Sequence, residues 1–122
     1  MTLRSAPLVV ASYRGGAFTI TGTRHLGSVV LFRDRVVAWP ATRVEDIDVA
    51  YLTALVAESA TQVEFLLLGC GTRLVPIPPV LRAALKACGV AVEPMDTGAA
   101  CRTFNVLTAE ERRVAAALIA VA

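Results

Sequence analysis

The sequence predicts a single α/β domain over residues 1–122, built on a mixed β-sheet. Short β-branched runs in antiparallel connection occupy the first half, and a strand, helix, strand unit with parallel strands occupies the second. The last third has helical spacing, which predicts helices at the C-terminus. A chain of 122 residues, 56% of them hydrophobic, is long enough to bury one core, and we expect residues 1–14 to be extended or partly ordered.

Three strands are predicted in the first half, in antiparallel connection. Asp34 lies in the short connection between the second and third runs and is a suitable turn residue. Pro40 ends the third strand, because proline has no backbone N–H for a ladder hydrogen bond. The predicted strands are Ala17–Ile20, Gly27–Phe32 and Arg35–Trp39.

The chain becomes helical after Asp48, a predicted N-cap, since apolar residues then recur at helical spacing. The uninterrupted apolar run Val63–Leu68 is typical of a buried strand. Residues Pro79–Cys88 have one apolar helical face, and Val90–Val92 form another apolar run. A strand, helix and strand with such short returns predict a βαβ unit with a right-handed crossover.

Two helices are predicted after this unit. Asp96 or Thr97 caps the first, which begins near Gly98. The run "TAEE", Thr108–Glu111, matches a capping box and predicts a second helix from about Ala109. Apolar residues further on share a helical face, which we expect to pack on the core: Val114, Leu118 and Val121.

The cysteines and the single histidine indicate no catalytic or metal centre. Cys70, Cys88 and Cys101 are an odd number without Cys-x-x-Cys spacing, and His25 is the only histidine. Small buried thiols in a reducing compartment explain them better than a nucleophile pair does. We therefore expect no metal, no cofactor and a non-catalytic domain.

Charge and hydropathy limit the partners of the chain. The formal net charge is +2, and eleven arginines are dispersed without a dense run, which predicts no nucleic-acid binding. The longest uncharged apolar run, Val114–Ala122, is about half the roughly 20 residues that a membrane-spanning helix needs. The N-terminal apolar patch is too short for a secretory signal. We expect a soluble cytoplasmic domain that is not integral to a membrane.

Asp96 begins an Asp-Thr-Gly-Ala run that resembles the active-site sequence of retroviral-type aspartic proteases. Such enzymes need two facing aspartates and an all-β body. The residues after Asp96 have helical spacing, and a βαβ unit precedes them, so the protease hypothesis fails. A helix cap is the simpler interpretation of Asp96.

The best candidate for a binding site is one edge of the sheet. The turn "GCGTR", Gly69–Arg73, and the segment Asp96–Gly98 both follow parallel strands, so we expect them at the same edge, where open α/β sheets bind ligands. Free N–H groups and arginines there suit an anion or a carboxylate. A tight structural turn is the competing explanation. The candidate residues for ligand or partner binding are Gly69, Gly71, Arg73, Asp96, Thr97, Arg102, Thr103 and Asn105.

Several motifs occur in an order that resembles one known family. They cover nearly the whole chain, and the most specific is the pattern D-T-x-x-A-x-x-T-F-N. The motifs are Gly15, Gly16, Phe18, Ile20 and Gly22; Gly27; Trp39; "LLLGCG", Leu66–Gly71; and "MDTGAACRTFNVL", Met95–Leu107, followed by Glu-Arg-Arg. The chain is similar to a domain of unknown function shared by small bacterial and archaeal proteins and by mitochondrial respiratory complex I assembly factor three.

The resemblance implies a three-layer β/β/α domain, in which a hammerhead-like antiparallel part packs beside a mixed sheet covered by helices. It also implies a non-catalytic binding or assembly factor with a respiratory-complex or other protein partner. The location it implies for eukaryotic relatives is mitochondrial. The alternative is a small-molecule or anion site at the Gly69–Gly71 and Asp96–Asn105 edge, in a binding protein or an enzyme. Family and fold do not by themselves fix function, so both hypotheses stay open.

Overall fold

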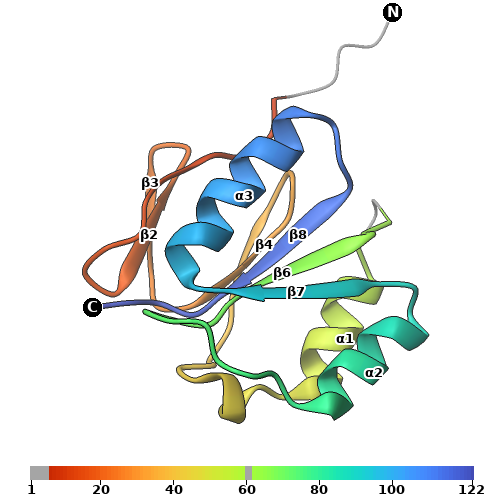
Figure 1. The fold of residues 1–122 in the computed structure, drawn as a ribbon. Helices are drawn as coiled ribbons and strands as arrows, with labels where there is room; N and C mark the ends of the chain where they lie inside the picture. The colour runs from red at the N-terminus through yellow and green to blue at the C-terminus, as the bar shows by residue number, and fades with distance from the viewer. Residues whose placement is uncertain (1–5, 60–61) are drawn as a thin grey trace, which may run out of the picture.

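The computed structural model of the protein describes residues 6–59 and 62–122 and consists of two β-sheets and three α-helices (Figure 1). A three-stranded antiparallel sheet has the order β1-β2-β3, and a five-stranded mixed sheet has the order β5-β4-β8-β6-β7. The elements are β1 (Val10–Ser12), β2 (Ala17–Ile20), β3 (Thr23–Leu26), β4 (Val29–Leu31), β5 (Val36–Ala38), a 3-10 turn (Val44–Asp46), α1 (Val49–Ala57), β6 (Phe65–Gly69), α2 (Pro79–Ala87), β7 (Ala91–Met95), α3 (Thr97–Ala109) and β8 (Val114–Leu118).

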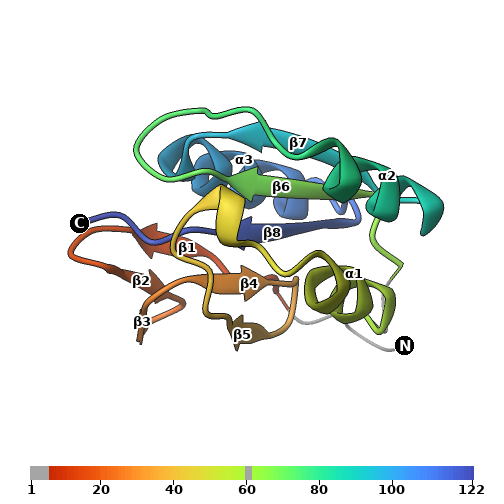
Figure 2. The same cartoon turned by 90° about the horizontal axis from the view of Figure 1, so that it is seen from below.

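The five-stranded sheet separates two hydrophobic cores. Figures 1 and 2 show α1 and α2 on one face of this sheet, and α3 with the three-stranded sheet on the other. Alternate residues of the central strand serve the two cores. Ala115, Ala117 and Ile119 face the α1/α2 side, whereas Val114, Ala116 and Leu118 face α3 and β2. The predicted α/β class with a β/β/α arrangement is confirmed.

The βαβ unit was predicted correctly. β6 and β7 pair in parallel, with Phe65 opposite Ala91 and Gly69 opposite Met95. Gly89 follows the C-cap of α2, and its φ of 79° suits glycine. The Gly89 and Val90 N–H groups donate to the carbonyls of Lys86 and Leu85. Asp48 caps α1, as predicted, by accepting from the Tyr51 N–H.

The predicted second C-terminal helix is wrong. Residues Val114–Leu118 form β8, which lies between β4 and β6 and is buried throughout. Thr108 does not begin a new helix, because α3 continues to Ala109 and the Thr108 hydroxyl donates to the Phe104 carbonyl. Glu111, with a φ of 61°, then turns the chain into the strand. The i, i+4 spacing of Val114 and Leu118 was interpreted as helical, but the same spacing also places two residues on one face of a strand.

The predicted pairing of the first strands needs correction as well. β2 pairs with β1 and β3, not with β4, which instead lies between β5 and β8. The sequence run Gly27–Phe32 therefore belongs to the larger sheet. The exposed strand β3 was not predicted, because its residues have no apolar alternation. Trp39 is buried, and its Nε1–H donates to the Leu118 carbonyl.

Candidate functional site

The predicted edge exists as a compact meeting point of three chain segments. We call it the strand-end junction and define it by Gly69, Gly71, Asp96, Thr97 and Ile119. The end of β6, the end of β8 and the start of α3 meet there. The Cys70 N–H donates to the Met95 carbonyl at 2.8 Å, and the Ile119 N–H donates to the Gly69 carbonyl at 3.0 Å. The sequence thus correctly predicted that the two turns share one edge.

Thr97 fastens the strand-end junction with its side chain and its backbone. Its hydroxyl accepts from the Gly71 N–H at 2.9 Å and donates to the Ile119 carbonyl at 2.7 Å. Its own N–H donates to the Gly71 carbonyl at 2.8 Å. The Thr97 side chain is fully buried, so each of these polar groups has replaced water by a protein partner. The hydroxyl is therefore occupied by structure.

Gly69 leaves no room for a ligand at the same place. A Cβ built on it would lie 3.0 Å from both the Cα and the Oγ1 of Thr97, and 3.1 Å from Leu118 Cδ2. Such distances are shorter than ordinary van der Waals contact, so there is no room even for one methyl group. The glycine is needed for the approach of α3 to β6. The strand-end junction is filled rather than open.

Asp96 is the N-cap of α3. Its Oδ1 accepts from the Ala99 N–H at 2.9 Å, which satisfies one of the free donors of the first helical turn. The helix cap inferred from the sequence is confirmed. The other N–H groups of this turn lie next to the strand-end junction, where Thr97 is already bonded.

Replacing Asp96 by alanine is expected to lower the free energy of unfolding by about 1 kcal/mol, the usual cost of a lost N-cap. Urea denaturation followed by circular dichroism measures the change. The matched control is the D96N variant, whose side chain keeps a cap oxygen without the charge. A loss in D96N as large as that in D96A would contradict a role limited to capping.

Three of the other predicted residues lie along α3, away from the strand-end junction. The Asn105 side-chain amide pairs with both backbone groups of Val10, at 2.9 and 3.0 Å, and so fixes β1 against α3. Arg102 is exposed and donates from Nη1 to the Tyr13 hydroxyl at 3.4 Å. Thr103 is half-buried on the same helix. These residues do not converge on one point.

Gly98, the third residue of the Asp-Thr-Gly run, is required by a close contact. A Cβ at this position would lie 2.7 Å from the Tyr13 hydroxyl oxygen and 2.9 Å from Tyr13 Cζ. The glycine therefore lets the Tyr13 ring lie directly against the first turn of α3. All three residues of the run have structural duties: a cap, a hydrogen-bonded brace and a close contact.

A polar hollow of about 480 Å³ lies beside the strand-end junction. Its lining includes Gly71, Arg73, Arg43 and Val121. Arg43 also pairs with Asp46, with Nε 3.0 Å from Oδ2, which offsets much of its charge. Of the eight predicted site residues, Gly71 and Arg73 line this hollow, and the rest lie elsewhere.

The thiols are not arranged for catalysis. Burial raises the pKa of the Cys101 thiol to about 12, so the reactive thiolate is scarce at neutral pH. Cys70 is buried beside the Leu68 carbonyl, whereas Cys88 is exposed. His25 lies on β3 in the smaller sheet, opposite Phe18 of β2. Within residues 6–59 and 62–122, no group of three histidines, cysteines or acids could hold a metal ion.

Thiol labelling tests this arrangement. At pH 7.5 the folded protein is expected to react rapidly with Ellman's reagent at Cys88 alone, because the other two thiols are buried. In denaturant all three cysteines should react. The C88S variant is the control, and rapid labelling of this variant in the folded state would contradict burial of Cys70 and Cys101.

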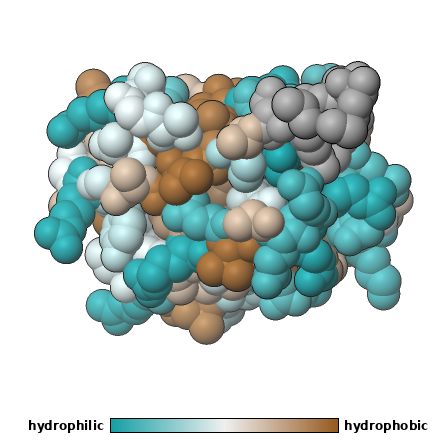
Figure 3. Space-filling view, turned by 90° about the horizontal axis from the view of Figure 1, so that it is seen from above, coloured by the Kyte–Doolittle hydropathy of each residue, from teal (hydrophilic) through white to brown (hydrophobic). Residues whose placement is uncertain are grey.

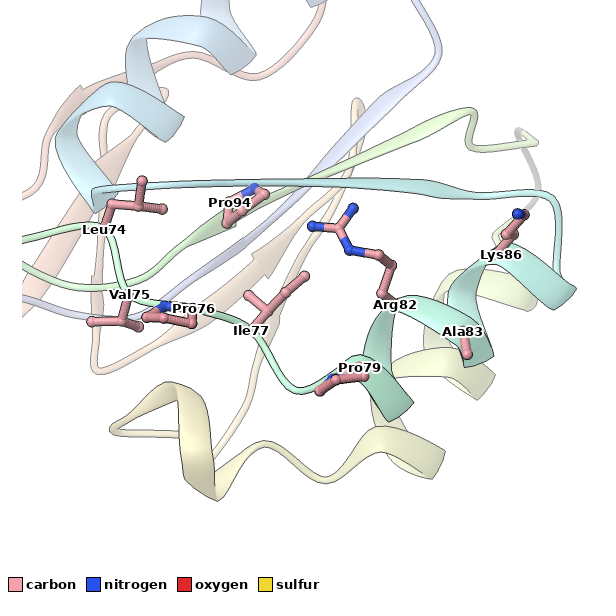
Figure 4. A pocket seen from close by; sticks show the side chains of 9 residues that line it. All are labelled: Leu74, Val75, Pro76, Ile77, Pro79, Arg82, Ala83, Lys86 and Pro94. Carbon is pink, nitrogen blue, oxygen red and sulfur yellow. The ribbon is translucent and has the colours of Figure 1, made fainter.

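An apolar groove beside β7 was not predicted from the sequence. Its volume is about 780 Å³, and it lies between β7, α2 and the segment that leads into α2 (Figure 4). The available signal was the run "LVPIPP", Leu74–Pro79, whose apolar residues up to Pro78 have no place in a helix or a strand. The lining residues are Leu74, Val75, Pro76, Ile77, Pro79, Arg82, Ala83, Lys86 and Pro94.

Other large apolar side chains are exposed outside this groove. Val9 and Val106 are each about half exposed, and Leu26 on β3 is 76% exposed. Figure 3 shows apolar side chains among hydrophilic ones on the face that it displays. In the described part of the chain, none of the helices has the length and apolar character needed to cross a membrane.

Known proteins are similar to this chain over nearly its full length. An uncharacterized protein of Rhodobacter capsulatus is 38% identical over 112 residues, which cover 92% of this chain and 84% of that protein. The NADH dehydrogenase [ubiquinone] 1 alpha subcomplex assembly factor 3 of Danio rerio is 37% identical over 115 residues. That match covers 94% of this chain but 66% of the zebrafish protein, so the chain spans about two thirds of that relative.

The fold is also found in solved structures. The crystal structure of a protein described as an outer membrane protein from Bartonella henselae superposes with a TM-score of 0.86 at 34% identity. The superposition covers 96% of this chain and 98% of that one. Residues 10–119 match a family described as protein of unknown function (DUF498/DUF598). Because this match spans almost the entire domain and the relatives share nearly all of its length, the chain belongs to the DUF498/DUF598 family, which is related to complex I assembly factor 3.

Proposed function

We propose that this protein is a non-catalytic assembly factor that binds a protein partner, a subunit of a respiratory NADH dehydrogenase complex. The observation that carries the proposal is the 37% identity to an assembly factor for such a complex over 94% of the chain. In this role the protein acts on the cytoplasmic side of the bacterial membrane. Transfer of a role from relatives is an inference by analogy, and it gains support from the character of the site.

The chemistry of the described residues supports binding over catalysis. The hydroxyl of Thr97 and the carboxylate of Asp96 are both used in structural hydrogen bonds. The Cys101 thiol is protonated at neutral pH because burial raises its pKa. An active site needs a nucleophile, base or metal aimed into a cavity. The groove beside β7 is instead apolar and open, which suits a protein contact.

Deletion of the gene in the native host tests the proposal. We expect less assembled NADH dehydrogenase on native gels of the membranes, with normal levels of an unrelated respiratory complex as the control. The wild-type chain, supplied on a plasmid, should restore assembly. Unchanged NADH dehydrogenase in the deletion strain would overturn the proposed function.

A small-anion site in the polar hollow is the second candidate, since Gly71 and Arg73 line it. A thermal-shift screen of phosphorylated and carboxylate metabolites tests it. A rise in melting temperature that disappears in R73A, with the fold intact, would favour this candidate over a purely protein-binding role. The matched control is R24E, which changes an exposed arginine on β3 in the other sheet.

A further inference from the structure

The groove beside β7 is built from a segment with little freedom. Residues Leu74–Pro78 lead into α2, which begins at Pro79, and three of the six residues Leu74–Pro79 are prolines: Pro76, Pro78 and Pro79. Proline fixes its own φ and restricts the residue before it. The segment therefore holds its shape without regular hydrogen bonding. A preformed surface of this kind loses little conformational entropy when a partner binds.

The floor of the groove is apolar and open to solvent. Figure 4 shows Val75, Pro76 and Ile77 along the segment, with Pro94 on β7 and Arg82, Ala83 and Lys86 on α2. Leu74, which lines the groove, is 60% exposed. A single exposed apolar residue is ordinary, but a contiguous set that lines a hollow indicates an interaction site.

The charge of the groove has one sign. Arg82 and Lys86 lie one helical turn apart on α2, and none of the nine lining residues is acidic. The same two cations line a second hollow of about 410 Å³, beside Gly89–Val92. The two hollows therefore share a positively charged border along α2. A complementary partner carries acidic residues beside an apolar surface.

The edge of β7 excludes one common mode of binding. β7 is one of the two edge strands of its sheet, so a strand added at the groove would pair with it. However, Arg82 Nη1 donates to the Val92 carbonyl at 3.3 Å, and Pro94 has no N–H to offer. Arginine cover and proline are both features that protect an edge from strand addition. A partner must therefore be held by side chains rather than by a backbone ladder.

From these features we infer that the groove binds an amphipathic helix of the partner protein, with its apolar face on Leu74, Ile77 and Pro94 and its acidic residues against Arg82 and Lys86. This mode is helix-in-groove recognition, in which apolar anchors recur at i, i+3, i+4 and i+7. The inference rests on the proposed function, because it names the surface through which the assembly factor holds its partner.

Site-specific photocrosslinking in the native host tests the inference. A benzophenone amino acid replaces Leu74 in the full chain, and the matched control carries it at Leu26, which is exposed on β3 in the other sheet. We expect crosslinks from position 74 to one segment of an NADH dehydrogenase subunit, identified by mass spectrometry. That segment should have helical apolar spacing and flanking Asp or Glu, and position 26 should not capture it.

A synthetic peptide copied from the captured segment then serves as the binding probe. Fluorescence anisotropy should show about tenfold weaker binding for L74D and for K86E, as expected for a lost apolar anchor and a reversed charge. The K86E effect should shrink at about 0.5 M NaCl, because salt screens exposed charges, whereas the L74D effect should not. R24E, an equally drastic change on β3, should bind as the wild type does.

Several results would overturn the inference that the groove binds a partner helix without affecting the proposed function. Capture of a second copy of this chain, of a lipid, or of a segment without acidic residues would do so. Absence of crosslinks at position 74 would also reject the groove as the binding surface. If the wild-type chain still restores assembly in the deletion strain, the partner must then contact another surface. Failure of the gene deletion to affect assembly would instead reject the proposed function itself.

Discussion

G69A is expected to lower the free energy of unfolding by about 2–3 kcal/mol, although it adds only one methyl group. The added Cβ would lie 3.0 Å from Thr97 Cα, a backbone atom that cannot rotate away. Relief requires α3 to move from β6, which weakens the hydrogen bonds between Thr97 and Gly71. Urea denaturation, fitted with a two-state transition, measures the loss.

G22A is the matched control for this prediction. A Cβ at Gly22 meets no atom within 4 Å, but its φ of 86° is unfavourable for alanine. The expected cost is about 1 kcal/mol and comes from backbone conformation alone. Gly69 has no such backbone conformation, so its larger loss would arise from the clash. A change below about 0.5 kcal/mol in G69A, typical of surface substitutions, would mean that the strand-end junction has free space.

T97V is expected to cost about 2–4 kcal/mol, because it keeps the shape of the side chain and removes its hydroxyl. The Gly71 N–H and the Ile119 carbonyl would each lose the partner they have at 2.9 and 2.7 Å. Thr97 and Ile119 are both buried, so water does not replace the lost bond to the Ile119 carbonyl. Leaving buried polar groups unpaired is more costly than losing an exposed hydrogen bond.

T97S separates the hydroxyl from the methyl group. This variant keeps the donor and acceptor and is expected to lose about 1 kcal/mol, the value for one buried methylene-sized group. Hydrogen exchange at the Gly71 amide gives a second measurement, since its protection should fall in T97V and persist in T97S. Equal stability of T97V and the wild type would show that the hydroxyl serves something other than structure.

Sequence spacing predicted the βαβ unit well, because the apolar patterns of its strands and helix are unambiguous. Leu66–Leu68 and Val92 are buried in parallel neighbours, and the helix between them has a clear apolar face that includes Leu81 and Leu85. β8 was missed because its five residues are all buried, so no alternation reveals the strand. Its three central alanines have high helix propensity, and the tertiary position between two strands outweighs it.

The position of the predicted edge follows from the sequence, whereas its packing does not. Adjacent parallel strands required Gly69–Gly71 and Asp96–Gly98 to meet, and they do. Whether that meeting point is open depends on side chains from distant parts of the chain. Leu118 and Ile119 come from the segment that was expected to be a helix, and Tyr13 comes from the N-terminal segment. Spacing within the Asp-Thr-Gly run contains no information on these neighbours.

The apolar groove was overlooked for a related reason. Its residues come from a loop, a helix and an edge strand, and each is ordinary alone. Proline-rich apolar segments are commonly interpreted as turns, because they cannot form a helix interior or a central strand. Only the placement of Leu74 and Ile77 beside Pro94 and the two cations of α2 gives the surface its character.

Complementation of the deletion strain with paired variants tests most directly whether the protein works through the groove or through the Arg102 side of α3. The double variant L74D/K86E is expected to keep the wild-type melting temperature and yet restore less than about a third of the assembled NADH dehydrogenase, since both anchor and charge are lost. R102A, at the predicted ligand edge, should restore assembly fully. Full restoration by L74D/K86E together with loss in a stably folded R102A would contradict this assignment.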